Sequence, residues 1–500
     1  MKFMGLDVGT TGVKAAVFDE SGKNIGYGFE SYEIIFGEGK QAEQDAEQVW
    51  RCAKKTMRDA SSMAGEDIAS ICVSAQGDAV MPINKNRVAL CPALLGMDYR
   101  TVVEANRCAE VLGDYDLFKK TGMRPHPLNS LTKMMWFQKN RRDLSGEIWK
   151  YATYSDFILL KLGADESVID LSMASRVMAL DLETKKWDRK ILEKVNIPES
   201  YLSKPVQSGS VIGKLGASLA DEIGVRSGAL IVAGGHDQPC AALGAGIAQE
   251  GAALDSHGTA EALSTVFETK HTDENMYLGY YPCTYHVIPD QFFTFALNHT
   301  GGILLQWLRD NFCGDDAKVT GKNGIGSYAY MIDKSPDMPA SVMVLPHFNG
   351  SGTPWCDLRS KGAILGLSMD TTRHDIVKAM LDSLTYEMKI NLERLEQAKV
   401  KIETIRCVGG AARSPKWMQL KADIFGRAVE TLEVREAACL GAAILAACAA
   451  GAFKTPAEAL AMVRVKDRFV PDSSLKRQYE RKYETYVKIY DSLKQLNGEL

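Results

Sequence analysis

Gly234-Gly235-His236-Asp237-Gln238-Pro239-Cys240 joins two segments of different character. Before it, residues 229–233 are apolar and uncharged, which predicts a buried strand. After it, small residues up to Gly246 predict a helix, and Pro239 suits the first helical turn, where its missing N–H costs no hydrogen bond. Asp237 is therefore expected at a strand-to-helix junction. There it either caps the helix or points a carboxylate into a site above the sheet.

The start of the chain predicts three strands, at 3–8, 13–18 and 24–30, joined by tight turns. The first turn lies within Asp7-Val8-Gly9-Thr10-Thr11-Gly12. Glycines and hydroxyls at a hairpin tip present N–H and O–H donors, which phosphate oxygens require. Asp7 beside them can hold Mg²⁺ through water, and Lys14 can add a positive charge. The alternative is an ordinary Gly/Thr hairpin turn.

A group of polar residues follows the next expected strand, at 68–74. Gln76 and Asp78 can donate and accept the hydrogen bonds that a polyhydroxylated ligand demands, and strand ends in α/β proteins gather such groups. Asp98 and Arg100, after an apolar pair, are further candidates. A surface or capping role is the alternative for each of the four.

The second half of the chain repeats the pattern of strand and turn. Residues 252–260 predict a strand followed by a turn with Gly258 and Thr259, a looser echo of the first turn. Gly301-Gly302 opens an apolar helix, and glycines allow close backbone approach to a ligand or a tight turn. A strand at 402–408 ends in Gly409-Gly410-Ala411-Ala412-Arg413-Ser414-Pro415, where a flat base can lie against the backbone. Two turns suited to phosphate, one early in each half, indicate a cleft between two similar domains.

Composition restricts the class of protein. The 500 residues are 46% hydrophobic with a net charge of −4, which suits two or more domains and predicts no nucleic-acid partner. The start shows no signal peptide, and the eleven cysteines form no C-x-x-C pair, so we expect reduced thiols in a cytoplasm. Residues 437–453 are uncharged but rich in alanine and short for a membrane span, which favours a helix packed inside the protein.

Together these motifs resemble the FGGY family of carbohydrate kinases from Met1 to about Phe453. Four motifs carry the resemblance: Asp7-Val8-Gly9-Thr10-Thr11, Gln76-Gly77-Asp78, Gly234-Gly235-His236-Asp237, and residues 409–419 with Ala422-Asp423. The last of them is similar to the family's C-terminal signature. The resemblance implies an α/β fold of the actin-like (ribonuclease H-like) ATPase type, with two domains and a cleft between them. Residues 1–248 are expected to form an N-terminal domain that binds the sugar and contains the first phosphate loop and the catalytic Asp. Residues 249–454 are expected to form a C-terminal domain that binds the nucleotide, and residues 455–500 a helical tail.

The resemblance also implies roles for individual residues. Asp237 matches the family's catalytic base and Asp7 the residue near Mg²⁺, while Gln76, Asp78, Asp98 and Arg100 match the sugar-binding stretches. The positions implied for ATP are Gly9, Thr10 and Thr11, with Lys14 just beyond them, then Gly258, Thr259, Gly301, Gly302, Gly410, Ala411 and Ser414. The implied reaction is transfer of the γ-phosphoryl group of Mg-ATP to a hydroxyl of a small sugar, and a homodimer is a reasonable expectation for the class.

Departures from the family pattern leave the substrate open. Asp78 stands where xylulose kinases typically have His, and Gly96-Met97 precede Asp98 where many members have Trp. A ketopentose such as xylulose is the leading expectation, and a polyol or sugar acid (erythritol, glycerol, gluconate) is the alternative. An actin-like ATPase switch and a non-catalytic sugar sensor are further interpretations of the same fold. A Rossmann dehydrogenase and a P-loop enzyme are disfavoured, because neither glycine-rich fingerprint is present in its place.

Overall fold

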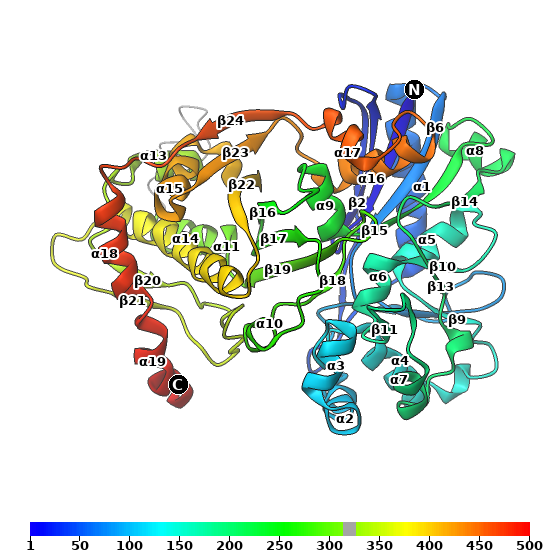
Figure 1. Cartoon of the computed structure of the whole chain (residues 1–500), viewed down its shortest axis with the longest axis horizontal. Coiled ribbons are helices and arrows are strands. Elements are labelled where there is room, and N and C mark those ends of the chain that lie inside the picture. Colours follow the sequence, from blue (N-terminus) through cyan, green and yellow to red (C-terminus); the bar gives the residue numbers. More distant parts are fainter. Residues whose placement is uncertain (314–326) are drawn as a thin grey trace.

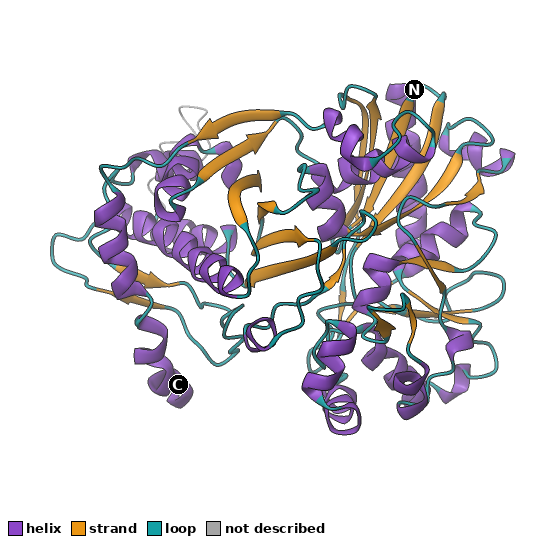
Figure 2. Cartoon of the chain, in the orientation of Figure 1, coloured by secondary structure: helices purple, strands orange, loops and turns teal. Residues whose placement is uncertain are grey.

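The computed structural model describes residues 1–313 and 327–500 and divides into two halves, each with a central sheet flanked by helices (Figures 1 and 2). The first sheet has the strand order β14-β15-β6-β1-β2-β3. Its strands are β1 (Lys2–Val8), β2 (Gly12–Asp19), β3 (Asn24–Ser31), β6 (Ile68–Ala75), β14 (Val211–Lys214) and β15 (Leu230–His236). The three strands predicted at the start of the chain are thus confirmed.

Parallel pairing determines which residues meet in this half. β6 lies between β1 and β15 and is parallel to both, so the carboxyl ends of the three strands lie at one edge of the sheet. All eight residues of β6 are buried, as expected for a strand covered on both faces. The helices of this half are α1 (Ala46–Ala64), α2 (Val102–Leu112), α3 (Asp114–Thr121), α4 (Ser130–Asn140), α5 (Tyr154–Leu162), α6 (Leu171–Arg176), α7 (Arg189–Lys194), α8 (Ala217–Ile223) and α9 (Asp237–Gly244).

Short strands complete the first half and form small pairs outside the main sheet. They are β4 (Ile35–Phe36), β5 (Ala42–Gln44), β7 (Met81–Ile83), β8 (Ala93–Leu94), β9 (Lys150–Ala152), β10 (Val168–Asp170), β11 (Leu180–Asp181), β12 (Lys186–Trp187) and β13 (Lys204–Val206).

The second half repeats the arrangement around a sheet of order β18-β19-β17-β16-β22-β23-β24. Its strands are β16 (Gly251–His257), β17 (Glu261–Phe267), β18 (Thr284–Tyr285), β19 (Phe292–Asn298), β22 (Ile402–Gly409), β23 (Ala428–Leu432) and β24 (Val465–Phe469), with β20 (Met343–Leu345) and β21 (Ala363–Leu365) paired separately. Its helices are α10 (Glu274–Leu278), α11 (Gly302–Phe312), α13 (Ser327–Lys334), α14 (Arg373–Gln397), α15 (Pro415–Phe425), α18 (Lys476–Tyr486) and α19 (Ile489–Glu499). Two further helices of this part of the chain, α16 (Ala437–Ala449) and α17 (Pro456–Ala459), lie with the first half (Figure 1).

The expected helical tail at 455–500 needs a correction, because β24 lies within it. β24 pairs antiparallel with β23 and extends the second sheet, so residues 465–469 belong to that sheet. The remainder is helical, and tyrosines of α18 lie buried, including Tyr479 and Tyr486. The many charged residues of the segment concealed the row of buried tyrosines on one face of α18.

The uncharged alanine-rich segment is α16, which packs inside the protein as expected. It contacts α9 and β1 so closely that side chains would not fit: a Cβ on Gly441 would lie 1.8 Å from the Cys240 carbonyl oxygen, and one on Gly5 1.9 Å from that of Cys439. Among the residues that the structure describes, no helix is long and apolar enough to cross a membrane.

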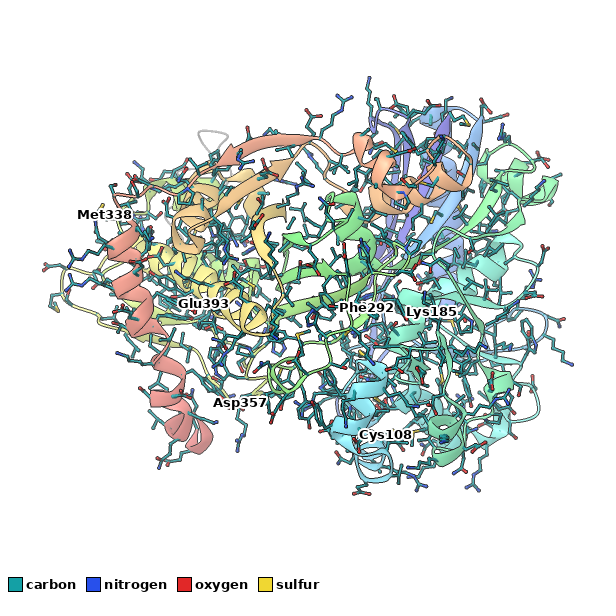
Figure 3. All side chains as sticks on the ribbon, viewed as in Figure 1. Cys108, Lys185, Phe292, Met338, Asp357 and Glu393 are labelled. Carbon is teal, nitrogen blue, oxygen red and sulfur yellow. The ribbon has the colours of Figure 1, made fainter. Side chains whose placement is uncertain are left out.

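The two halves also meet at the sheet edge formed by β18 and β19. Figure 3 shows Phe292 and Lys185 close together at this boundary. The ring of Tyr285 stacks on Phe292 at 5.1 Å between centroids, and Lys185 lies over the Tyr285 ring at 5.5 Å. The amide of Tyr285 donates to Ser175 Oγ of α6 at 3.1 Å. Helix α6 therefore lies directly at the boundary.

We predict that Gly441→Ala lowers the free energy of unfolding by about 1–3 kcal/mol, because its Cβ meets backbone rather than a side chain that can move. Urea denaturation measures this. Gly498→Ala in α19 is the matched control, since a Cβ there meets nothing within 4 Å and should be neutral or slightly stabilising. Equal stability of the two variants would contradict the close packing of α9 and α16.

Candidate active site

Three of the predicted site residues meet at the carboxyl edge of the first sheet. Val8 is the register partner of Ala75, and Ala75 is that of His236. Asp7, Gln76 and Asp237 therefore lie on or just beyond three neighbouring strands. The amide of Gln76 donates to the Val8 carbonyl at 2.8 Å, which fixes this edge.

Asp237 is the first residue of α9 and is not the residue that precedes the helix. Its side chain is 28% exposed, so the carboxylate reaches accessible space. His236 Nε2 lies 3.1 Å from Asp237 Oδ1, and burial keeps the pKa of His236 well below its ordinary value. Burial and the nearby charge of Asp7 raise the pKa of Asp237 to about 7. A carboxyl group with this pKa exchanges protons near neutral pH.

Asp7 is tied to the sheet by Ser74, whose hydroxyl donates to Asp7 Oδ1 at 2.8 Å. Burial raises the pKa of Asp7, and the Ser74 hydrogen bond and the charge of Lys14 only partly oppose this. A nearby cation would therefore stabilise the ionised form. Carboxylate oxygen is the ligand type that Mg²⁺ prefers, so the group fits that ion.

Hydrogen bonds accepted by its backbone carbonyls hold the first expected phosphate loop in place. The Gly9 amide donates to the Gly12 carbonyl at 3.0 Å, while the Tyr32 hydroxyl and the Gln44 amide donate to the carbonyls of Gly9 and Thr10. The side of the tip with Thr11 is exposed. The carbonyls thus point into the protein, which leaves donors at the tip for an anion.

The second expected loop joins three separate segments. The Gly302 amide donates to the Gly258 carbonyl at 2.9 Å, and that of Gly301 donates to the Thr259 carbonyl at 2.8 Å. A Cβ on Gly301 would lie 2.8 Å from Ala260, so glycine is required there. The Gly410 amide donates to the carbonyl of His257, the residue before Gly258, at 3.0 Å. The structure therefore brings these glycines together.

Two members of the adenine-side motif have structural roles here. Ser414 is the N-cap of α15, and its hydroxyl accepts from the Trp417 amide at 3.3 Å. Ala411 is buried. Gly410 is exposed, and it lines the cavity described below.

A cavity of about 970 Å³ lies between the two halves. Lys14 and Tyr27 line it from the first half, and Gly410 and Arg413 from the second. Lys14 Nζ also lies 2.6 Å from a Glu436 carboxylate oxygen, at the start of α16. Lys14 is therefore placed between the halves, with its charge shared with Glu436.

A buried ionic cluster lies beneath the second loop. Lys421 Nζ lies 2.6 Å from Asp255 Oδ2 and 2.5 Å from Glu261 Oε1, and all three side chains are fully buried. Although burial alone would raise it, the charge of Lys421 lowers the pKa of Glu261 to about 2. Asp255, His257 and Glu261 offer ligand atoms within 4.8 Å of one another, but the lysine ammonium already provides the cation. The cluster ties α15 to both strands that flank Gly258.

The sugar stretch is less uniform than the sequence indicated. Asp98 is fully buried and accepts from the Ala42 amide at 2.8 Å and from Arg100 Nε at 2.9 Å. Arg100 also pairs with Glu43 at 2.7 Å. These contacts hold loops together and occupy most of what both side chains offer. Gln76 Nε2 donates to the Gly9 carbonyl at 3.2 Å, which joins the sugar stretch to the first loop.

Asp78 has a partner that sequence reasoning missed, Arg176 at the end of α6. Lys421, Ser74 and Glu436 were missed as well. Only Lys421 left a signal, as a charge on the expected apolar face of its helix, four residues after Trp417. Arg176 left none, because its partner lies 98 residues away in the chain.

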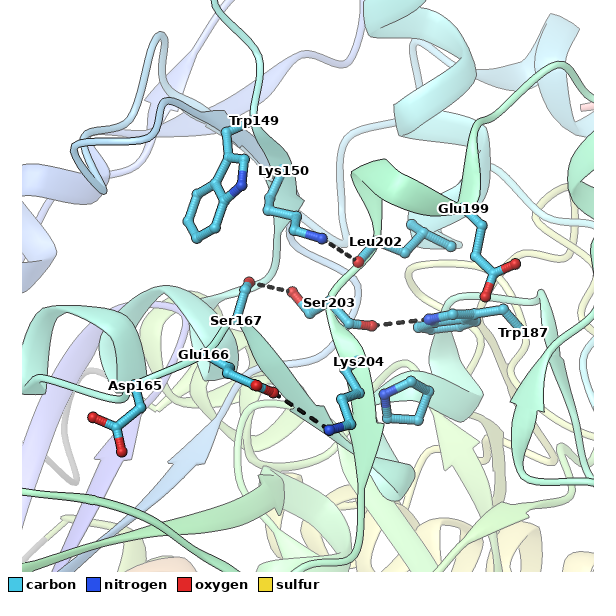
Figure 4. Close-up of a pocket in the computed structure, with 11 residues that line it drawn as sticks. Trp149, Lys150, Asp165, Glu166, Ser167, Trp187, Glu199, Leu202, Ser203 and Lys204 are labelled. Carbon is cyan, nitrogen blue, oxygen red and sulfur yellow. Dashed lines mark hydrogen bonds and ion pairs between the residues drawn. The ribbon is translucent and has the colours of Figure 1, made fainter.

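A second pocket lies elsewhere in the first half, with a volume of about 470 Å³ (Figure 4). Trp149 and Trp187 line it, together with an ion pair between Lys204 and Glu166 at 3.3 Å. It contains none of the predicted site residues.

Comparison with known proteins identifies the family. The N-terminal domain of the FGGY family of carbohydrate kinases matches residues 2–244, and its C-terminal domain matches residues 254–450. The chain belongs to the FGGY family of carbohydrate kinases. It is an ATP-dependent sugar kinase, as the sequence motifs predicted.

Individual relatives differ in their named substrate. A xylulose kinase of Staphylococcus epidermidis is 27% identical, with 99% of this chain and 98% of the relative covered. A gluconokinase of Bacillus subtilis is 28% identical, with 90% and 87% covered. The structure of a ligand-bound xylulose kinase from Lactobacillus acidophilus superposes with a TM-score of 0.90, at 21% identity and with 100% and 99% covered, which confirms the fold. These comparisons therefore establish the family of this chain but do not identify the sugar that it phosphorylates.

We predict that Lys421→Met lowers the free energy of unfolding by about 3–5 kcal/mol, because two buried carboxylates lose their cation. Chemical denaturation followed by circular dichroism measures the loss. Lys476→Met, at an exposed position, should change stability by less than about 0.5 kcal/mol. If Lys421→Met lost no more stability than the Lys476→Met control, the cluster would not be what holds the loop.

Proposed function

We propose that this kinase transfers the γ-phosphoryl group of Mg-ATP to a hydroxyl of a ketopentose such as xylulose, with Asp237 as general base. The observation that carries the proposal is the position of Asp237 at the first residue of α9, at the same sheet edge as Asp7, where burial and the charge of Asp7 raise its pKa to about 7. A full-length relative named xylulose kinase supports the ketopentose. A sugar acid is the second candidate, because a gluconokinase is equally similar.

Asp237 performs the proton transfer in this mechanism. A sugar hydroxyl is a poor nucleophile, so the carboxylate accepts its proton as the new O–P bond forms. The pKa of about 7 makes the carboxylate a stronger base than an ordinary aspartate while a large fraction stays ionised at neutral pH. The backbone at the start of α9 is held in place, because α9 is packed against α16 through glycine contacts.

The two loops position the phosphates. Phosphoryl transfer needs alignment and charge neutralisation more than covalent help. The donors at the two loop tips come from Thr10, Thr11 and Thr259, because the amides of Gly9 and Gly258 already donate to carbonyls within their loops. The loops belong to opposite halves, and Lys14 lies between the halves. Mg²⁺, when bound near Asp7, supplies further charge neutralisation. Gly410 offers its exposed backbone to the adenine.

We expect Asp237→Asn to reduce kcat by about 10²–10⁴-fold with little effect on nucleotide affinity, because the amide accepts no proton. ADP release with Mg-ATP is measured across ketopentoses, polyols and sugar acids. Asp273→Asn, at the N-cap of α10, is the matched control and should keep its activity. Wild-type ADP release that ignores every acceptor would instead indicate an ATPase switch, and equal rates in wild type and Asp237→Asn would remove Asp237 as the base.

The pH dependence follows from the same group. Only the ionised carboxylate accepts a proton, so kcat/KM should fall about tenfold per pH unit below the pKa near 7 and level off above it. A rate profile measured at constant ionic strength tests this. The residual activity of Asp237→Asn should lack the acid limb. A wild-type profile that stays flat through neutral pH would contradict the assignment.

A further inference from the structure

The last two helices of the structure, α18 and α19, lie beyond residue 450, where the match to the family's C-terminal domain ends. Each buries a tyrosine whose hydroxyl donates to a carboxylate that Figure 3 labels. Tyr483 of α18 donates to Glu393 Oε2 on α14 at 2.7 Å, and Tyr490 of α19 donates to Asp357 Oδ2 at 3.1 Å. The two tyrosines are similarly buried, at 8% and 4% exposed. Tyr483 therefore holds α18 to a helix, whereas Tyr490 holds α19 to a loop.

That loop is the connection between β20 and β21, residues 346–362, which we call the β20–β21 loop. Tyr490 contacts it at a second point, because its ring lies 4.6 Å from that of Trp355. The loop is also folded on itself. The Asp357 amide donates to Ser351 Oγ at 2.8 Å, and the Asp357 carbonyl accepts from the Ser351 amide at 2.9 Å. The segment that Tyr490 holds is thus a compact unit.

The tail reaches the two ends of this loop through a buried chain of polar groups. Tyr486 donates to Glu387 Oε1 at 2.6 Å, and Glu387 Oε2 lies 3.4 Å from His347 Nε2. His347 Nδ1 lies 2.7 Å from Ser360 Oγ, which joins the start of the loop to its end. All four side chains are buried. Because buried polar groups need partners, this chain favours a single position of the loop.

The opposite side of the loop lies against the end of β19. The Thr353 amide donates to the Leu297 carbonyl at 2.9 Å, and the Leu297 amide donates to Thr353 Oγ1 at 2.9 Å. A Cβ on Gly352 would lie 1.7 Å from the Leu297 carbonyl oxygen, so the two backbones are in close contact. Thr300 is buried, and its hydroxyl donates to the Pro346 carbonyl. The loop therefore holds both the strand and the segment that follows it.

Thr300 connects this packing to the nucleotide side of the site. The next two residues are Gly301 and Gly302, whose amides donate to the carbonyls of the second expected phosphate loop. A displacement of Thr300 would disturb both hydrogen bonds. A loop that is already held in its binding conformation loses less entropy when it binds a ligand, so its affinity for that ligand is higher.

We infer that Tyr490 is a positioning residue for nucleotide binding. It holds the β20–β21 loop through Asp357 and Trp355, and that loop holds Thr300 and the glycine pair after it. This inference rests on the proposed function, because it requires that the turn at Gly258–Thr259 receives the phosphates of ATP. It gives the C-terminal helices a part in the reaction that they perform through the β20–β21 loop.

The test compares matched tyrosine variants by titration calorimetry with Mg-ADP. Tyr490→Phe should raise the Kd by about threefold, because the loop loses one hydrogen bond that keeps it in place. Tyr490→Ala also loses the ring contact with Trp355 and should raise the Kd by about tenfold. Tyr483→Phe and Tyr483→Ala remove the equivalent groups from α18 and should leave the Kd unchanged.

Two further readouts separate positioning from a general loss of stability. Hydrogen–deuterium exchange should become faster at residues 297–302 and 346–362 in Tyr490→Ala but not in Tyr483→Ala. With the acceptor that the wild type phosphorylates, KM for ATP should rise with the Kd, while KM for the acceptor stays within about twofold.

A double-mutant cycle tests the route through Asp357. Asp357→Ala removes the acceptor of the Tyr490 hydroxyl, so it should weaken Mg-ADP binding by itself. Adding Tyr490→Phe to Asp357→Ala should change the Kd little further, because both substitutions remove the same hydrogen bond. Fully additive effects would contradict this route. The cycle and Tyr490→Phe decide the question if Tyr490→Ala does not fold.

The outcomes also separate the inference from the proposed function. Wild-type protein that binds Mg-ADP, with unchanged affinity in the folded Tyr490 variants, overturns the inference alone. An equal loss of affinity in the Tyr483 variants overturns it as well, because the effect would then come from loosening of the tail. Wild-type protein that binds no Mg-ADP overturns both the inference and the proposed function on which it rests.

Discussion

The close contact between α9 and α16 is the constraint on which the rest of the structure depends. Glycines at 244 and 441 let the two backbones meet, and Gly5 lets α16 lie against β1. No side chain can be inserted at these points without moving a helix. The start of α9 is consequently fixed relative to the first sheet, and Asp237 with it. β16, the first strand of the second sheet, follows α9 in the chain, so the same contact also fixes where the second half begins.

Charge is distributed unevenly around this fixed point. Asp78 has a buried arginine, Asp7 has a serine hydroxyl, and Asp237 has an accessible carboxylate with a raised pKa. The first arrangement suits binding of hydroxyls, the second suits holding a cation, and the third suits accepting a proton. The buried lysine cluster on the other side of the cleft has no such exposure, and its contacts tie together elements that flank a loop. The accessible carboxylate of Asp237 is therefore the candidate for chemistry, whereas the fully buried lysine cluster has a structural role.

Local patterns predicted much of the fold, because strands, turns and caps depend on neighbouring residues. The hairpin at Gly9–Gly12 and the helix that begins near Pro415 are examples of such patterns. The sequence also supplied the family motifs, and the family models matched both halves. It could not supply pairings between distant segments, such as Arg176 with Asp78. It also missed β24, because a charged edge strand has no clear apolar alternation.

The most direct measurement is a structure of the kinase with its acceptor and a non-hydrolysable ATP analogue. The central claim is that Asp237 takes a proton from the hydroxyl that attacks the γ-phosphorus. It predicts a carboxylate oxygen of Asp237 within about 2.6–3.2 Å of that hydroxyl oxygen, with the γ-phosphate on its far side. A reacting hydroxyl that lies beyond hydrogen-bond reach of Asp237, against Asp78 or Asp7 instead, would contradict the claim.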